Sequence, residues 1–242
     1  MKKYIKRLVK FLALIFGEIL ARISQLTGSL AAFLLYLAQW RLSTPEWFDG
    51  RLTHLSPKKW SNDLHHIIYS NVLEVLPMGG RVLDICSGDA FIPCYVYSRR
   101  ADQVVCIDYD PGAAAHARRH HLKRNIQYFH QSIFDFKWED EWFDVVVIRG
   151  AIEHFTQQQQ QAIFTFAKRV LKQGGYFCGD TPANKPNVDK LLDSHEYEWR
   201  DEAQMKEELS KVFSDVNTRV YVSREPADNK TLRTSLIWRC RK

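Results

Sequence analysis

The sequence has few cysteines, and none has the paired spacing of a zinc or redox site. Its five cysteines are odd in number, include no Cys-x-x-Cys pair, and in several cases lie inside apolar runs: Cys86, Cys94, Cys106, Cys178 and Cys240. We therefore expect reduced, buried thiols in a cytoplasmic domain, rather than a disulfide framework or a zinc site.

The nine histidines also lack a metal-binding motif. His65-His66, His116 and His120-His121 fall on predicted helices, and no cluster of carboxylates accompanies them in the sequence. Metal ligands usually come as a recognisable set of side chains. The sequence therefore predicts solvated surface histidines and no metal ion.

Outside its first 51 residues the chain has almost no excess of positive charge. The formal net charge is +6, and residues 1–51 hold eight basic against three acidic side chains, a net charge of +5. The rest of the chain is close to neutral, which argues against a nucleic-acid-binding face there. The basic character belongs to the N-terminus.

The N-terminal segment, residues 1–42, combines this charge with long apolar runs. Five basic residues occur within the first ten, and 18 uncharged residues run from Ile23 to Trp40. On a helix, the polar residues form one stripe on an otherwise apolar surface: Lys3, Arg7, Lys10, Glu18, Arg22 and Gln25. Such a helix is typical of a membrane interface.

Other interpretations of this segment stay open. A cleaved signal peptide is disfavoured because Glu18 and Arg22 interrupt the apolar core. A single span fits by length but would place the main domain away from cytosolic cofactors. A shallow hairpin bent near Gly28-Ser29 keeps both ends cytoplasmic. The remaining alternative is a helical arm packed on its own domain or on a second subunit.

The main domain is organised around one stretch, residues 81–90. An apolar strand containing Asp84 runs into the short loop Cys86-Ser87-Gly88-Asp89-Ala90, and about 20 residues later a second apolar strand ends at Asp108. In doubly wound sheets, nucleotide-like ligands bind at such a loop, and an acid at the second position accepts the ribose hydroxyls.

The remaining pattern alternates strands and helices. After a linker at 43–55, Ser56-Pro57 begins a helix that we expect to end near Leu76. Strands are predicted at about 81–86, 103–108, 126–130, 143–148 and 176–180, with helices at 91–100, 110–123, 156–171 and 201–212 between and after them. A closing hairpin pairs 218–222 with 235–240. The predicted fold is α/β: a doubly wound, mostly parallel seven-stranded sheet with an antiparallel C-terminal hairpin and an N-terminal helical extension.

Over residues 56–242 this chain resembles the class I S-adenosylmethionine-dependent methyltransferases. Their first-strand motif, Val-Leu-Asp-x-Gly-x-Gly-x-Gly, stands here as Val82-Leu83-Asp84-Ile85-Cys86-Ser87-Gly88-Asp89-Ala90, so only the middle glycine is kept. The backbone still permits close approach of a ligand if Cys86 and Ala90 avoid positive φ. Residues 143–155 and 169–175 look like the branch that acts on quinones, lipids and other small molecules.

The resemblance implies S-adenosyl-L-methionine as cofactor and a definite set of site residues. The cofactor-binding residues it implies are Asp84, Cys86, Ser87, Gly88, Ala90, Asp108, Tyr109, Ser132, Ile133 and Arg149. Ser132 stands where the branch often has an aspartate for the adenine amine, and Asp135 follows three residues later.

Candidate catalytic residues follow the fourth strand and lie in a later loop. Glu153 and His154 are expected on the ligand side of the sheet, and His195 beside Glu196 in a loop over the acceptor, with Tyr197 and Trp199 lining the pocket or packing the lid. A base there helps to deprotonate a hydroxyl or amine acceptor. Capping of the next helix by His154 and an exposed loop position for His195 are the structural alternatives.

We therefore expect a methyltransferase at the inner face of a membrane, acting on a lipid-like or amphipathic small molecule by in-line displacement. A nicotinamide enzyme is disfavoured because the loop lacks Gly-x-Gly-x-x-Gly. Two alternatives stay open: a domain that has lost catalysis and serves as a scaffold, and a soluble enzyme whose N-terminal arm mediates dimerisation.

Overall fold

A computed structural model describes residues 2–41, 62–186, 188–224 and 232–242. The chain divides into two compact units, residues 1–60 and 61–242. The linker predicted at 43–55, the helix start at Ser56-Pro57 and the hairpin turn at 226–229 lie outside the described residues.

The first unit contains one long helix, α1 (Lys2–Arg41). It continues through Gly28 and Ser29, which contradicts the alternative of a hairpin bent at that point. Apolar side chains of α1 are exposed at several of the positions whose burial the structure describes: Phe11, Phe16 and Leu26 are 59%, 62% and 71% exposed. Among the described residues, no helix has an apolar stretch long enough to cross a membrane.

The second unit is built on a seven-stranded sheet with the order β3-β2-β1-β4-β5-β7-β6. Its parallel strands are β1 (Gly80–Ile85), β2 (Ala101–Asp108), β3 (Ile126–His130), β4 (Phe143–Arg149) and β5 (Leu171–Pro182). Antiparallel β7 (Leu232–Arg241) and β6 (Asp215–Arg224) complete the sheet at one edge. The predicted fold class is confirmed.

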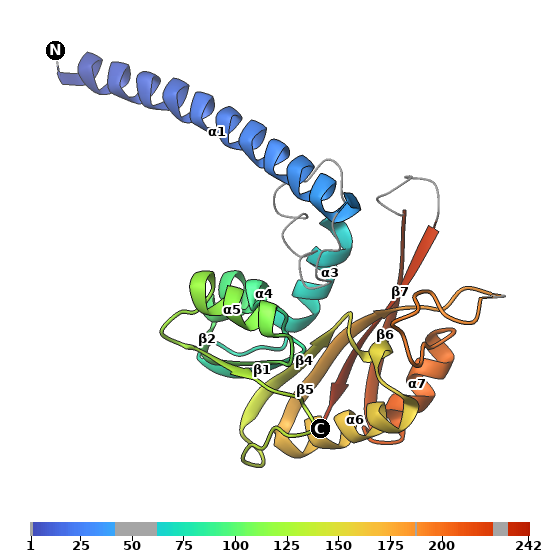
Figure 1. The fold of residues 1–242 in the computed structure, drawn as a ribbon. Helices are drawn as coiled ribbons and strands as arrows, with labels where there is room; N and C mark the ends of the chain where they lie inside the picture. Colours follow the sequence, from blue (N-terminus) through green and yellow to red (C-terminus); the bar gives the residue numbers. More distant parts are fainter. Residues whose placement is uncertain (1, 42–61, 187, 225–231) are drawn as a thin grey trace. The chain divides into compact units, whose positions relative to one another are not determined.

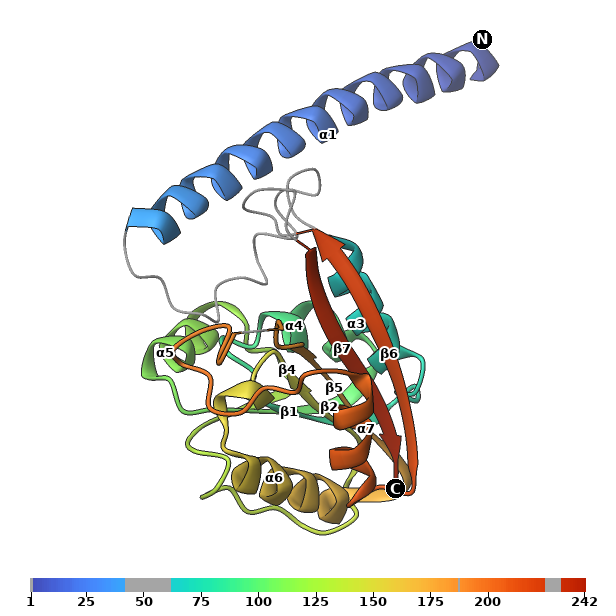
Figure 2. The ribbon, with the colours of Figure 1, turned by 90° about the vertical axis from the view of Figure 1, so that its right-hand side faces the viewer.

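Helices cover both faces of this sheet. Figures 1 and 2 show α4 (Phe91–Tyr95) and α5 (Pro111–His120) on one face and α6 (Gln157–Val170) on the other. Successive strand residues point to opposite faces. In β1, Val82 accordingly joins the core beneath α3 (Asn62–Leu73) and α4, whereas Leu83 and Ile85 join the core beneath α6 and α7 (Glu202–Ser210).

Two helix starts follow the local rules that the sequence displays. Asp110 caps α5 by accepting the amide of Ala113 at 2.6 Å. Thr156 and Gln159 form a capping box at the start of α6, in which each side chain binds the other residue's backbone N–H. Such caps satisfy amides that would otherwise have no partner in the helix.

The first crossover helix is shorter than predicted. It ends at Tyr95, with Val96 as its C-cap, and is followed by a 3-10 turn at Tyr97–Arg99, instead of continuing to residue 100. The carbonyl oxygen of Cys94 accepts the Ser98 hydroxyl at 2.7 Å and also the Lys123 ammonium. Side chains therefore occupy the acceptor that the next helical amide would have used.

The end of α6 also differs from the prediction. The helix stops at Val170, and Leu171 already has extended φ and ψ, so Gly174-Gly175 does not form its C-terminal cap. Instead, these glycines lie within β5, where Gly174 adopts a φ of +77° and the pairing with β4 shifts register. A residue without Cβ tolerates this conformation.

Candidate active site

The candidate site lies where the strand order of the sheet reverses. β1 and β4 are neighbours, but the chain leaves β1 toward β2 on one side and β4 toward β5 on the other. The helices that follow therefore pack on opposite faces and leave a crevice at the carboxyl ends of these strands, which is the usual ligand position in open α/β sheets. Every candidate from residue 84 to residue 154 lies in or just after β1–β4.

The loop after β1 turns through three left-handed residues. Cys86, Gly88 and Ala90 have φ values of +54°, +56° and +58°. The condition that Cys86 and Ala90 avoid positive φ is therefore not met: the loop takes left-handed φ at two residues that carry Cβ atoms. Left-handed conformations cost such residues roughly 1–2 kcal/mol each. Burial raises the pKa of the Cys86 thiol, with Asp108, Asp84 and Glu153 adding to the effect, so the thiol stays protonated.

Asp108 fastens this loop to the end of β2. Its Oδ2 accepts the amide of Gly88 at 2.8 Å, and its Oδ1 accepts the amide of Asp110 at 2.9 Å. Tyr128 donates its hydroxyl to the carbonyl of Gly88 at 2.6 Å from the neighbouring strand. A carboxylate has about four lone-pair sites, so Asp108 retains capacity to accept ribose hydroxyls.

The residues expected around an adenine follow β3. The amide of Gln131 donates to the carbonyl of Asp108 at 2.9 Å, which places Ser132 and Ile133 beside the end of β2. Ile133 is buried, whereas the hydroxyl of Ser132 accepts the amide of Phe134 at 3.3 Å. Tyr109 is 73% exposed. Its position just after Asp108 leaves an aromatic ring available to a ligand.

Arg149 binds two buried elements of the protein. Its Nε lies 3.4 Å from Asp180 Oδ1 on β5, and its guanidinium lies over the ring of Tyr69 at 5.0 Å. Its Nη2 is 3.4 Å from Nδ1 of His65 on α3. These contacts join α3 to the centre of the sheet. They provide Arg149 with a structural role beside the cofactor role that the resemblance implies.

Asp84 lies near this cation and is 4% exposed. Burial raises the pKa of Asp84 to about 7, while Arg149 opposes the rise and Asp108 and Asp180 add to it. The folded chain therefore holds a proton on Asp84 that the unfolded chain releases. From about pH 4 to pH 7, this group makes the folded state less stable as the pH rises.

We expect Asp84→Asn to remove this pH dependence. Relative to the wild type, the variant should gain about 3 kcal/mol in the free energy of unfolding between pH 4.5 and pH 8, at up to about 1.4 kcal/mol per pH unit. Urea unfolding at several pH values measures the difference. Asp102→Asn, an exposed substitution at the other end of β2, is the control. Parallel pH curves for Asp84→Asn and the wild type would contradict the prediction.

The predicted catalytic residues come together past the end of β4. Suitable ligand atoms of Glu153, His154 and His195 all lie within 4.8 Å of one another. The rings of His154 and His195 meet edge to face at 4.8 Å between centroids. His195 is 3% exposed, so the alternative of an exposed loop residue is wrong. Residues 42 positions apart in the sequence thus form one cluster.

Glu153 is the buried acid of this cluster. Its Oε2 accepts the Thr181 hydroxyl at 2.8 Å. Burial raises the pKa of Glu153 to about 7, and the neighbouring Asp180 adds to the rise, whereas Thr181 and His154 oppose it. A carboxyl group with such a pKa exchanges its proton near neutral pH.

Three residues that support this cluster were missed in the sequence. The carboxylate of the buried Glu198 forms a hydrogen bond with Nδ1 of His195 and accepts another from the amide of Leu191 at 2.8 Å. Thr181 binds Glu153, as described above. Gln160 is 1% exposed and donates to the carbonyls of Ile152 and Tyr197, both at 2.8 Å. It ties the segment holding Glu153 to the segment holding His195.

The glutamine tract that contains Gln160 is therefore not simply a solvated first turn. Gln157 and Gln161 donate to the carboxylate of Glu208 on α7 at 2.9 and 2.8 Å. Trp199, considered as a pocket residue, is 1% exposed and packs edge to face on Trp238, so it belongs to the core. The roles of these glutamines and of Trp199 therefore follow from their neighbours in space and not from the sequence around them.

A second histidine cluster lies behind the loop after β1. His121 is buried, and its Nδ1 lies 2.8 Å from the carbonyl oxygen and 3.3 Å from Oδ2 of Asp89. Nε2 of His116 is 3.8 Å from the same Oδ2. The prediction of surface histidines without a carboxylate is therefore wrong for His116 and His121, because Asp89 reaches them across the fold.

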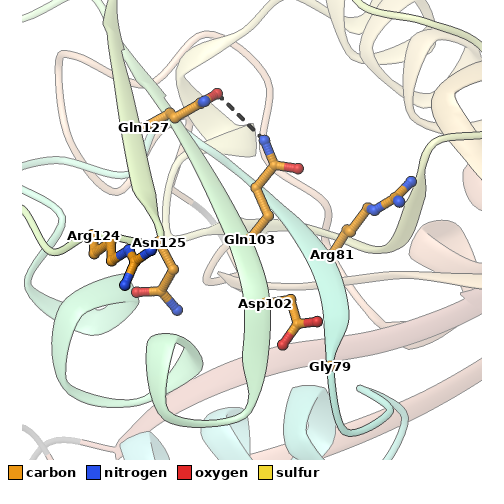
Figure 3. Close-up of a pocket in the computed structure, with 7 residues that line it drawn as sticks. All are labelled: Gly79, Arg81, Asp102, Gln103, Arg124, Asn125 and Gln127. Carbon is orange, nitrogen blue, oxygen red and sulfur yellow. Dashed lines mark hydrogen bonds between the residues drawn. The ribbon is translucent and has the colours of Figure 1, made fainter.

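The hollow shown in Figure 3 is a different place. It has a volume of about 370 Å³ and lies at the amino ends of β1, β2 and β3, between Gly79, Arg81, Gln103 and Asn125. The side chains of Gln103 and Gln127 meet across it at 3.4 Å. Ligands of open α/β sheets bind at the opposite, carboxyl ends, so this hollow is not the crevice of the candidate site.

Comparisons with known proteins agree with this geometry. Residues 82–175 match the family model described as a methyltransferase domain. A search among curated protein sequences gives no significant match. Among solved structures, the N-methyltransferase NodS from Bradyrhizobium japonicum WM9, with bound S-adenosyl-L-homocysteine, is 15% identical with a TM-score of 0.60, and the match covers 75% of this chain and 86% of that one.

Two further structures share the fold. An N-methyltransferase from Haemonchus contortus, in complex with phosphomonomethylethanolamine and S-adenosylhomocysteine, is 17% identical with a TM-score of 0.59, covering 74% of this chain and 52% of that one. The [4+2]-cyclase SpnF is 15% identical with a TM-score of 0.61, covering 76% and 82%. At these identities the likeness establishes the fold, which evidently accommodates more than one chemistry.

Proposed function

We propose that the protein is an S-adenosylmethionine-dependent methyltransferase and that it methylates an amphipathic or lipid-linked small molecule at a membrane surface. The match of residues 82–175 to a methyltransferase-domain model supports the reaction type. The arrangement of Asp108 and the loop after β1 beside the cluster of Glu153, His154 and His195 supports methyl transfer. The exposed apolar side chains of α1 support the choice of acceptor.

The side chains at the carboxyl ends of β1, β2 and β3 suit the chemical groups of the cofactor. Asp108 would accept the ribose hydroxyls, and the turn at Cys86, Gly88 and Ala90, although strained at its two residues with Cβ atoms, would present its backbone to the ligand. Ile133 and Tyr109 would contact the base. Asp84 would supply negative charge for the methionine end once the cationic cofactor has favoured its charged form.

S-adenosylmethionine supplies a methyl group made electrophilic by its sulfonium. The protein has to align the acceptor with it, exclude water and manage the acceptor's proton. Glu153 and His154 follow β4 directly, and His195 covers them from the later loop. In our proposal, these three residues help to remove the proton from a hydroxyl or amine acceptor.

The membrane part of the proposal rests on α1. Lys6 and Lys10 are exposed near its start, ahead of a run of exposed apolar side chains that includes Phe11, Phe16 and Leu20. A basic, apolar helix binds anionic lipid by charge and by insertion of its apolar side chains. Acceptors dissolved in that membrane would be concentrated near the enzyme.

One experiment tests both parts. Full-length protein is incubated with anionic vesicles carrying a bacterial lipid extract and methyl-labelled S-adenosylmethionine. We expect label in the organic phase and protein on the vesicles. Phe11→Asp/Phe16→Asp should reduce vesicle binding at least 10-fold, because apolar insertion is lost. Asp108→Ala should bind vesicles normally but transfer no label.

The outcomes separate the two parts of the proposal. The membrane role would be refuted by two results together. The wild-type protein would not bind the vesicles, and the α1 variant would transfer as much label as the wild type. Absence of transfer despite binding of S-adenosylhomocysteine would favour the scaffold alternative, for which the strained loop at Cys86 and Ala90 is the structural argument.

A further inference from the structure

We propose that Glu153, His154 and His195 bind one divalent transition-metal ion, and that this ion coordinates the oxygen of a hydroxyl-bearing methyl acceptor. The site itself depends only on the three side chains. Its part in the reaction rests on the proposed methyl transfer. A metal-assisted acceptor would narrow the substrate class from hydroxyls and amines to hydroxyls.

The first argument is the orientation of the two imidazoles. Nδ1 of His154 lies 3.1 Å from the carbonyl oxygen of Ser194, and Nδ1 of His195 lies against the carboxylate of Glu198. A carbonyl or carboxylate accepts a hydrogen bond from Nδ1–H, so in the neutral form of each ring the lone pair is at Nε2. Metal-binding histidines almost always have such a partner on the other ring nitrogen, which fixes the tautomer and the ring orientation.

The second argument is the carboxylate that completes the set. Glu153 is 3% exposed, and the hydrogen bond from Thr181 orients it without using all its lone pairs. Ligand atoms of the three residues lie within 4.8 Å of one another. In a bound complex, with ligands about 2.1 Å from the ion, they would be about 3–4 Å apart, so small side-chain rotations close the site.

The third argument is location. Glu153 follows β4 and is close enough to the cofactor loop to raise the pKa of Cys86. His154 is only half-buried, which leaves the cluster open to solvent. Two imidazoles and one carboxylate leave coordination positions for another ligand, as in catalytic metal sites.

The chemistry of an acceptor hydroxyl fits such an ion. Coordination lowers the pKa of a bound oxygen acid by several units. The hydroxyl releases its proton to solvent, and its oxygen forms a bond to the methyl carbon. The carbon–sulfur bond breaks, and its electron pair remains on sulfur. An amine acceptor needs its lone pair for the attack and would gain nothing from coordination.

The ligand set also predicts which ion binds. Imidazole nitrogens favour zinc and neighbouring first-row ions, whereas magnesium prefers an all-oxygen set. Full-length protein, stripped with a chelator, is therefore titrated calorimetrically with zinc chloride and separately with magnesium chloride. We expect one zinc ion to bind at Glu153, His154 and His195. Magnesium should bind there at least 100-fold more weakly than zinc.

Variants locate the ion. His154→Ala and His195→Ala should each weaken zinc binding at this site at least 100-fold. Glu198→Gln, which changes only the partner of His195, should weaken it about 10- to 100-fold. With cobalt as a spectroscopic probe, Glu198→Gln should shift the visible absorption bands, a change that a purely structural role would not produce.

The control is His116→Ala, because His116, His121 and Asp89 form the other histidine and carboxylate cluster among the described residues. It should leave the site unchanged. The proposal would be overturned if the wild type did not bind zinc. It would also be overturned if His116→Ala abolished zinc binding while His154→Ala left it unchanged. Since His154 is only half-buried, its variant is expected to fold.

S-adenosylhomocysteine binding, measured in the same samples, keeps this inference separate from the proposed function. Cofactor binding without zinc binding refutes the metal site alone. Zinc binding that follows the predicted variants, in a protein that does not bind S-adenosylhomocysteine, supports the site and refutes methyl transfer.

Discussion

Replacing Asp108 with alanine will weaken the binding of S-adenosylhomocysteine about 100-fold or more. Two hydroxyl groups on a half-buried carboxylate form charge-assisted hydrogen bonds, each contributing about 1.5–3 kcal/mol, and 1.4 kcal/mol corresponds to a factor of ten in affinity. The substitution also releases the amide of Gly88, which Asp108 holds at 2.8 Å. The loop that approaches the ligand then loses its anchor.

Calorimetric titration of full-length protein measures this effect. Asp102→Ala provides a matched control, because it removes a carboxylate from the same strand at the opposite edge of the sheet, beside the hollow. It should leave the affinity within a factor of about two. Full affinity in Asp108→Ala would show that the cofactor crevice has been placed wrongly.

Replacing Gly179 with alanine will destabilise the domain by about 4 kcal/mol or more. Gly179 pairs with Trp238 in the register between β5 and β7, and the indole, which is fully buried, lies across the glycine. A Cβ at this position would overlap the Trp238 ring and the carbonyl oxygen of Ile148. The backbone oxygen cannot move without breaking the pairing of β4 with β5.

Overpacking usually costs about 1–3 kcal/mol, and an additional backbone clash explains the larger value. Since domains are stable by only about 5–15 kcal/mol, Gly179→Ala should lower the melting temperature by ten degrees or more. Gly150→Ala is the comparison: its φ is +49° but no atom lies within 4 Å of the added Cβ, so about 1 kcal/mol is expected. Equal losses in the two variants would rule out the steric explanation.

Local signals in the sequence predicted most of the fold. The strand at Ile126–His130 was predicted to the residue, and the caps at Asp110 and Thr156 follow from side chains within three residues of the amides they bind. Each of these features depends on neighbours along the chain. The position of Asp108 at the end of β2 was predictable for the same reason.

The misses depend on contacts between distant parts of the chain. Gln160 reads as one of five equivalent glutamines until the carbonyls of Ile152 and Tyr197 are found around its amide. The partnership of His121 with Asp89 spans 32 positions and leaves no periodic signature. The positive φ of Ala90 contradicts the usual preference of its residue type.

The buried acids beside the loop give the crevice a dependence on the charge of its ligand. At neutral pH, Asp84 is partly protonated, and burial also raises the pKa of Asp108. A cationic cofactor favours the charged carboxylates, so its arrival expels protons; a product that has lost its sulfonium charge lets them return. The loss of the methyl group thus weakens the attraction that held the cofactor. In the proposed reaction, release of the product is therefore expected to be accompanied by proton uptake.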